Sequence, residues 1–360
     1  MGSDGGKAVI VVLTMCFIAM YATPPTVTKL LDHWGYVFPW LTAVLMTSGW
    51  PVHLGVILGH KLTHEVDDGR VPLTLKLTAK LCAMGVLDSV HMITLAFAIN
   101  WLPGSTYMLL KSTNIVFNVV ESRIFLKKEL TRYHAASVVL LLTSTAVLAS
   151  HKSDHKESNG ITSSKHLFGF IFAIISAFSN ASQAVLASFL LKDVKKSTSM
   201  RTVAEAAFFN GISAWLVIIV CWLISREWTE YSAVWTDASH KDNRHLYIIL
   251  CMVAVALTKQ TGMFFKFAVI SKSSALFAAV ADVARRMIVV ILVVKLFHES
   301  FPWQKAVACA MTVPGIALYI YGGHLLKQRA AARAKESPPL LSAVIPPGES
   351  VKAAPSINEA

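Results

Sequence analysis

The chain has 360 residues, of which 54% are hydrophobic and only 15% are charged. Soluble globular proteins carry about 25% charged residues, so this composition excludes an ordinary soluble protein and indicates a polytopic membrane protein. The formal net charge of +12 lies largely in short loops, where lysine and arginine set membrane topology, and we expect a lipid bilayer as the partner and no nucleic acid.

Ten apolar segments follow one another along the chain. A helix needs roughly 20 apolar residues to cross a hydrocarbon core about 30 Å thick, and each segment is close to that length. We therefore predict an all-α membrane protein with ten transmembrane helices. Lysine and arginine concentrate in the loops on the side of the N-terminus, which places both termini in the cytosol. The predicted helix limits are 8–29, 35–59, 73–99, 102–125, 133–150, 166–191, 204–225, 246–270, 274–297 and 303–325.

Two pairs of these helices resemble each other. The pair over 102–125 and 133–150 and the pair over 274–297 and 303–325 both have a charged group at mid-depth and an acidic turn. The pairs are five helices apart, an odd number, so the second copy enters the membrane upside down, as in the inverted repeats of transporters. The predicted units are a first five-helix repeat over 1–160, a second over 161–328, and a disordered cytosolic tail over 329–360.

Charged residues lie at mid-depth in the helices predicted over 73–99 and 102–125. In the first, Asp88 and His91 could relay a proton, or Asp88 could be the counter-ion of Lys111 in the second. An ammonium at the depth of Lys111 must find an anion or water, because an isolated charge in hydrocarbon costs several kcal/mol. Lys111 is therefore a candidate for substrate binding.

Four amides extend this candidate site. Asn114 and Asn118 follow Lys111 at spacings of three and four, so all three lie on one face of the helix. Asn180 and Gln183 share a face of the helix predicted over 166–191 and are suited to the recognition of a hydroxyl or a base. Amides also join transmembrane helices by hydrogen bonds, and this purely structural role is the alternative for all four.

The helix predicted over 274–297 carries Asp282, Arg285 and Arg286 in its apolar middle. Asp282 can reach both arginines at three and four residues, which leaves one guanidinium to hold an oxyanion through its planar fork. The alternative is a static ion network that only fixes packing. Lys259, near the middle of the helix predicted over 246–270, is a further candidate for substrate binding.

The mid-depth charges are unbalanced, because four basic residues oppose two acidic ones. A cavity with this excess attracts phosphate or carboxylate rather than a cation, so we expect an anionic small-molecule substrate. The sequence has no phosphate-binding loop, metal-ligand spacing or nucleophile motif, and we predict no enzyme, no catalytic residue, no cofactor and no metal. The residues counted are Lys111, Lys259, Arg285, Arg286, Asp88 and Asp282.

The stretch ADVARRMIVV resembles the helix 9 signature of the nucleotide-sugar and triose-phosphate translocator branch of the drug/metabolite transporter superfamily. Asp282 stands where that signature has asparagine, and Arg285 and Arg286 stand at its Lys-Arg pair. STYMLLKSTNIVFNVVESRIF resembles helix 4 of the branch, with Lys111 at its lysine. The resemblance implies two inverted five-helix repeats, antiport across an organelle membrane and a basic pair that binds the substrate's phosphate. The absence of a lysine at 187–189 makes triose phosphate a poor fit.

These observations favour an antiporter of an anionic metabolite, such as a nucleotide-sugar or a sugar phosphate. The alternative is a proton-coupled vacuolar or lysosomal exporter of amino acids, peptides or drugs, of the chloroquine-resistance-like type. A second alternative is a non-transporting membrane scaffold, in which the polar residues only join helices. The sequence is also compatible with a homodimer.

The tail suggests an address within the cell. Glu336, Leu340 and Leu341 fit the acidic dileucine pattern that sorts membrane proteins to lysosomes or vacuoles. The Golgi apparatus or the endoplasmic reticulum is the alternative. In either case we expect a multi-pass protein of an endomembrane.

Overall fold

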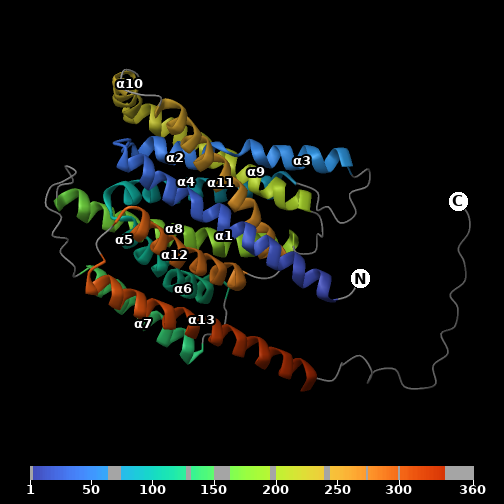
Figure 1. The fold of residues 1–360 in the computed structure, drawn as a ribbon. Coiled ribbons are helices and arrows are strands. Elements are labelled where there is room, and N and C mark those ends of the chain that lie inside the picture. The colour runs from blue at the N-terminus through green and yellow to red at the C-terminus, as the bar shows by residue number, and fades with distance from the viewer. Residues whose placement is uncertain are drawn as a thin grey trace, which may run out of the picture.

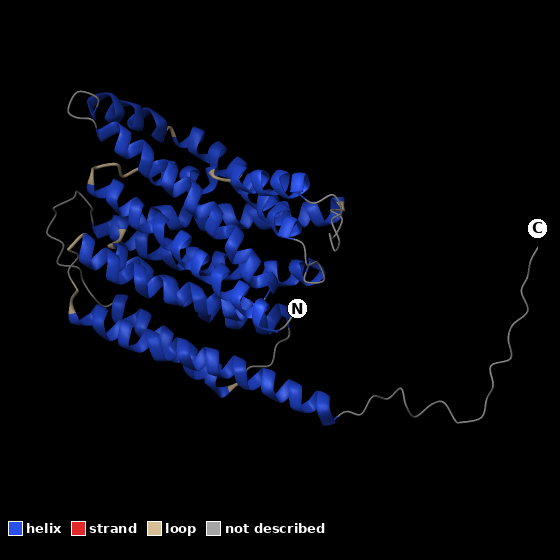
Figure 2. Cartoon of the chain, turned by 45° about the vertical axis from the view of Figure 1, so that its right-hand side comes forward, coloured by secondary structure: helices blue, strands red, loops and turns tan. Residues whose placement is uncertain are grey.

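The computed structural model describes residues 3–63, 74–126, 131–149, 163–194, 200–238, 244–272, 275–298 and 301–336. These residues form helices and no strand (Figure 2). The first half holds α1 (Ser3–His33), α2 (Pro39–Ser48), α3 (Pro51–Thr63), α4 (Leu75–Trp101), α5 (Gly104–Leu110), the 3₁₀ turn η1 (Lys111–Thr113), α6 (Asn114–Leu126) and α7 (Arg132–Ala149). The second half holds α8 (Ser163–Val194), α9 (Met200–Ser225), α10 (Glu227–Ala238), α11 (Arg244–Lys272), α12 (Ala275–Leu296) and α13 (Trp303–Glu336).

The helices pack as a bundle in which each half contacts the other along its length. The most extensive contacts join α1 to α11, α4 to α8 and α7 to α13. The pair α7 and α13 runs along one edge of the bundle, and α10 lies at the end opposite the start of α1 (Figure 1). The start of α1 and the end of α13 lie at the same end of the bundle in both ribbon views.

Seven helices within the described ranges are long and apolar enough to cross a membrane. They confirm a polytopic all-α membrane protein, whereas length and composition alone do not establish ten spans. The predicted spans over 102–125, 133–150 and 274–297 are not among the seven: η1 divides α5 from α6, α7 with 18 residues is shorter than any of the seven, and charged residues interrupt α12. The seven spans are Ala8–His33, Pro39–Leu62, Leu75–Trp101, Ser164–Leu190, Met200–Ser225, His245–Lys272 and Trp303–Leu326.

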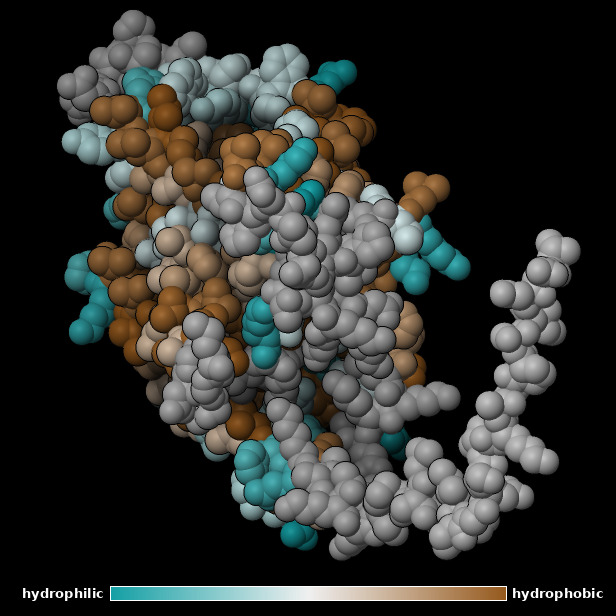
Figure 3. All heavy atoms as spheres, turned by 90° about the vertical axis from the view of Figure 1, so that its right-hand side faces the viewer, coloured by the Kyte–Doolittle hydropathy of each residue, from teal (hydrophilic) through white to brown (hydrophobic). Residues whose placement is uncertain are grey.

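The outer surface of the bundle is apolar. Hydrophobic residues make up much of the described surface along its flanks (Figure 3). Large apolar side chains such as Val12, Phe125 and Ile224 are more than half exposed. An apolar patch of this extent needs a cover in water, and a lipid bilayer provides one.

Two helical segments differ from the sequence prediction. The tail was predicted to lose structure after Gln328, but α13 continues to Glu336, because alanine, arginine and lysine in this stretch are strong helix formers. The connection between the helices predicted over 204–225 and 246–270 contains the additional helix α10. Of the predicted sorting residues, Glu336 ends α13, and Leu340 and Leu341 lie outside the described residues.

The start of α2 is held by a carboxylate from α10. The N-cap residue Phe38 has no side-chain cap, and Glu227 instead accepts from the backbone N–H groups of Trp40 at 3.2 Å and Leu41 at 2.7 Å. Burial raises the pKa of Glu227 above its usual value, and these two hydrogen bonds oppose that shift. The cap fixes the position of α2, whose other end reaches the candidate site.

Candidate functional site

Three helices of the first half are interrupted, and each interruption disturbs a backbone carbonyl. Pro25 in α1 has no N–H, so the carbonyl of Tyr21, four residues earlier, loses its helical partner. Pro51 at the start of α3 has no N–H for the carbonyl of Thr47 in α2. In η1 the chain tightens to 3₁₀ geometry, whose hydrogen bonds are poorer. The Lys111 carbonyl accepts from the backbone N–H of Asn114 and can accept a second donor.

The two arginines of α12 donate to two of these carbonyls. Arg285 Nη1 lies 3.0 Å from the carbonyl oxygen of Tyr21, and Arg286 Nη1 lies 2.6 Å from that of Lys111. Both guanidiniums also bind Asp282: Arg285 Nε and Nη2 lie 2.9 and 2.7 Å from Oδ1, and Arg286 Nη2 donates to Oδ2. The arginines are only 2% and 1% exposed. Both guanidiniums are thus engaged by Asp282 and a backbone carbonyl, while Nε of Arg286 has no hydrogen bond to a described residue. A role of the pair in binding an oxyanion stays a prediction.

Gln260 of α11 satisfies the third interruption. Its Nε2 lies 3.0 Å from the carbonyl oxygen of Met46 and 3.4 Å from that of Thr47. Its Oε1 lies 3.1 Å from Nε2 of the buried His53. The close approach of α2 to α11 here needs a glycine, because a Cβ on Gly49 would lie 2.1 Å from the carbonyl oxygen of Ala256.

Tyr21 is the point at which α1, α11 and α12 meet. Lys259 of α11 donates to the Tyr21 hydroxyl and lies 3.9 Å from the centroid of its ring. The guanidinium carbon of Arg285 lies 5.2 Å from the same centroid. The Tyr21 hydroxyl lies 3.6 Å from the sulfur of Met263. The aromatic face thus stabilises two buried cations, a role that charge counting from the sequence did not identify.

A narrow cavity lies between these helices. Three of the predicted site residues line it, namely Lys111, Lys259 and Arg285, together with the rings of Tyr21 and Tyr107. The other described residues of its wall are apolar, and none of the described lining residues is a carboxylate. The free space is about 20 Å³, enough for about one water molecule. A larger ligand enters only if the surrounding helices move apart.

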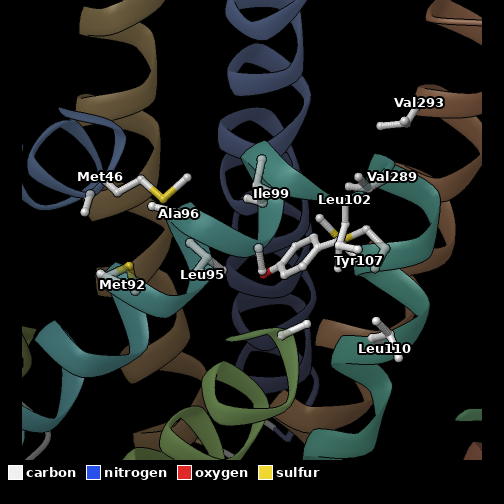
Figure 4. Close-up of a cluster of buried hydrophobic side chains, with 14 of the residues drawn as sticks. Met46, Met92, Leu95, Ala96, Ile99, Leu102, Tyr107, Leu110, Val289 and Val293 are labelled. Carbon is white, nitrogen blue, oxygen red and sulfur yellow. The ribbon is translucent and has the colours of Figure 1, made fainter. Parts of the chain in front are cut away.

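Tyr107 and Lys111 form one side of this cavity. The ring of Tyr107 extends from α5 toward Leu95 of α4 (Figure 4), and its hydroxyl makes no hydrogen bond to the described part of the chain. Lys111 is 4% exposed, and its Nζ lies 5.7 Å from the centroid of the Tyr107 ring. Unlike Lys259 and Arg285, Lys111 has an ammonium that forms no hydrogen bond or ion pair with the described residues. It is therefore available to a ligand.

Asp88 belongs to a separate polar cluster. One oxygen of this buried carboxylate accepts from Asn210 Nδ2 at 3.1 Å, and the other makes no hydrogen bond to a described residue. Asn210 Oδ1 lies 3.5 Å from Gln183 Nε2. The described residues show no ion pair between Asp88 and Lys111, and an amide of α9 binds the carboxylate. Both predicted roles of Asp88 stay predictions. His91 is held by α8, with Nδ1 2.9 Å from the carbonyl oxygen of Ser176.

The predicted amides do not line the cavity. Asn180 Oδ1 accepts from Lys266 at 3.3 Å, and Asn118 Oδ1 accepts from Ser122 at 3.2 Å. Asn114 is buried, and its amide oxygen has no partner among the described side chains. The bonds of Asn118 and Asn180 join neighbouring turns or helices, which is a structural role for these two amides.

Residues 9–329 match a family model described as purine nucleobase transmembrane transport. The chain is 24% identical over 283 residues to probable purine permease 5 of Arabidopsis thaliana, with 79% of this chain and 77% of the relative covered. It is 22% identical over 322 residues to purine permease 3 of the same plant, with 88% and 91% covered. One solved structure, named only as the crystal structure of a protein, superposes on this chain with a TM-score of 0.56 at 15% sequence identity. The superposition covers 88% of this chain and 99% of the other chain, so the two share a fold.

The Asp282→Asn substitution tests the ion network of α12. It leaves two buried guanidiniums without a carboxylate, and breaking a buried pair in this way costs about 3–5 kcal/mol. We expect a melting temperature of the detergent-purified protein several degrees below that of the wild type. The matched control is Asp32→Asn, which removes the more exposed 2.8 Å pair with Lys29 and costs about 1 kcal/mol or less. Equal melting temperatures for the two variants would contradict this account.

Proposed function

The chain belongs to the purine permease family, whose model covers residues 9–329, and from this premise we propose that it carries purine nucleobases across a membrane. The relatives are named purine permeases, which supports a transporter with a purine as its substrate. Family membership corrects the expectation of a nucleotide-sugar or sugar-phosphate carrier. The basic pair of α12 resembles a phosphate site in sequence, but it is occupied by Asp282 and two backbone carbonyls.

The observation that carries this proposal is the chemistry of the cavity wall. Tyr21 and Tyr107 contribute aromatic rings, and the apolar remainder suits a flat heterocycle. Ligand sites are typically apolar with a few polar groups that fix orientation, and a base stacks on an aromatic ring with a gain of about 1–3 kcal/mol. Since the free space is about 20 Å³, the cavity must widen to admit a purine, as alternating access between two halves requires.

We propose further that the two halves are inverted repeats of five spans each, with α5–α6, α7 and α12 as the three spans in addition to the seven given above. The packing supports this arrangement, because α1 contacts α11 and α12 in the way that α8 contacts α4 and α6. In the repeats over 1–160 and 161–328, α1 corresponds to α8, α4 to α11, and α6 to α12. The cavity then lies between the repeats, where transporters of this type bind substrate.

The placement in the cell follows the same proposal. The start of α1 and the end of α13 lie at one end of the bundle, which supports two termini on the same side of the membrane. We assign that side to the cytosol, because lysine and arginine concentrate in the loops at this side. We assign the protein to an endomembrane on the acidic dileucine pattern of Glu336, Leu340 and Leu341. Membership of a family of transporters argues against a non-transporting scaffold.

Replacing Tyr107 tests the aromatic site. Tyr107→Leu removes the stacking surface, and we expect uptake of radiolabelled purine nucleobases into proteoliposomes to fall at least about tenfold. Tyr107→Phe keeps the ring and loses only a hydroxyl without a hydrogen bond to a described residue, so its uptake should stay within about threefold of the wild type. Tyr133→Leu, which alters an aromatic pair of α7 and α13 outside the cavity, is the control. Unchanged uptake by folded Tyr107→Leu would contradict the site.

A proton-coupled mode is the second candidate, and the buried carboxylate of Asp88 favours it. One of its oxygens has no hydrogen bond to a described residue, so it can accept a proton without breaking a bond. Asp88→Asn cannot titrate. We expect this variant to lose the dependence of purine uptake on a pH gradient while it retains exchange at equal pH on both sides. Gradient-driven uptake at the wild-type rate would exclude Asp88 as the coupling group.

A further inference from the structure

The polar part of the cavity wall consists of hydrogen-bond donors without an acidic acceptor. Its charged groups are Lys111, Lys259 and Arg285. The nearest carboxylate along α12, Asp282, accepts from both arginines. Asp88 binds Asn210 and does not line the cavity. A ligand in this cavity therefore meets positive charge that no acidic side chain of the wall offsets.

Of the three cations, Lys111 is the one available to a ligand. Lys259 donates to the Tyr21 hydroxyl, and Arg285 is held by Asp282 and the Tyr21 carbonyl. Lys111 has no such bond to the described residues, and its ammonium lies 5.7 Å from the Tyr107 centroid.

The backbone of Lys111 is itself fixed in place. Arg286 Nη1 donates to the Lys111 carbonyl at 2.6 Å, and the residue lies in the 3₁₀ turn η1. The turn and this hydrogen bond direct the side chain into the cavity beside the Tyr107 ring. A flat base stacked on Tyr107 would consequently present one edge to the ammonium of Lys111.

The hydrogen-bonding edge of a purine determines how well it binds an ammonium, and this edge differs between 6-oxopurines and 6-aminopurines. A 6-oxopurine carries two adjacent acceptors, O6 and N7, and lysine is a common partner of this pair. A 6-aminopurine carries N7 and an amino group, which is a donor. An ammonium and an amino group are both hydrogen-bond donors, so they repel each other at this edge. An ammonium that faces O6 and N7 donates a hydrogen bond to each of these acceptors.

On the basis of the proposed purine transport, we propose that Lys111 selects 6-oxopurines, such as hypoxanthine, guanine and xanthine, over 6-aminopurines such as adenine. The charge of Lys111, which has no ion pair with a described residue, adds to this preference for bases that lose a proton readily. The mid-depth basic residues, from which the sequence predicts an anionic substrate, would then favour purines with several hydrogen-bond acceptors. Arg286 acts as a positioning residue, because it holds the backbone of Lys111.

The test measures uptake of radiolabelled hypoxanthine and adenine into proteoliposomes that contain the full-length protein. The wild type should prefer hypoxanthine by roughly tenfold, the size of discrimination that one good base contact provides. Lys111→Met keeps the length of the side chain and removes its charge, so hypoxanthine uptake should fall roughly tenfold while adenine uptake changes little. Lys29→Met in α1, outside the cavity wall, is the matched control and should keep the wild-type preference.

The outcomes separate this inference from the proposed function. Equal uptake of both bases by the wild type, or a preference for adenine, overturns the assignment of 6-oxopurines and leaves purine transport standing. Uptake of neither base overturns purine transport and this inference with it. Equal losses for both bases in Lys111→Met contradict a selective role for Lys111. If that variant does not fold, competition of unlabelled xanthine and adenine against hypoxanthine in the wild type decides the question.

Discussion

The structure depends on backbone carbonyls in the interior of a membrane protein that the helices themselves do not satisfy. An unsatisfied polar group in hydrocarbon costs several kcal/mol, so the carbonyls of Tyr21 and Thr47, which lose a helical partner to proline, need a donor from elsewhere. The carbonyl of Lys111 takes a side-chain donor in addition to the backbone N–H of Asn114. Arg285 supplies one to α1, Arg286 to η1, and Gln260 to the end of α2. These three interrupted segments belong to the first half, and their donors belong to the second. The buried arginines therefore have a structural role, because they join the two halves of the protein through these hydrogen bonds.

This arrangement places the cavity where the two halves are bonded to each other. Tyr21 and Lys111 lie on interrupted segments, and their carbonyls are held by α12, while their side chains line the cavity. Any movement that separates the halves must break these hydrogen bonds or carry the interrupted segments along. Binding and conformational change thus share the same few residues. The aromatic rings offer a surface for a base, and among the three cations of the cavity wall Lys111 is the one without a hydrogen bond to a described residue.

The sequence predicted what depends on composition and local spacing. The all-α membrane fold followed from hydropathy, and the pairing of Asp282 with both arginines from spacings of three and four residues. It did not predict Tyr21 or Gln260 as partners, because these bonds join residues 264 and 214 positions apart. The overlooked signal was proline, which removes one helical hydrogen bond four residues upstream. A count of charges also could not show that two of the four basic residues bind Asp282 and backbone carbonyls, because these bonds depend on the packing of α12 against α1 and η1.

A double-mutant cycle between Pro25→Ala and Arg285→Met tests the central claim most directly. Alanine at 25 restores an N–H for the Tyr21 carbonyl, so the carbonyl no longer depends on the arginine. Unfolding free energies of the four proteins in detergent should then reveal a coupling of about 1–3 kcal/mol, with Arg285→Met less destabilising when alanine is present. Additive effects of the two substitutions would show that the arginine does not compensate for the proline, and would contradict the account.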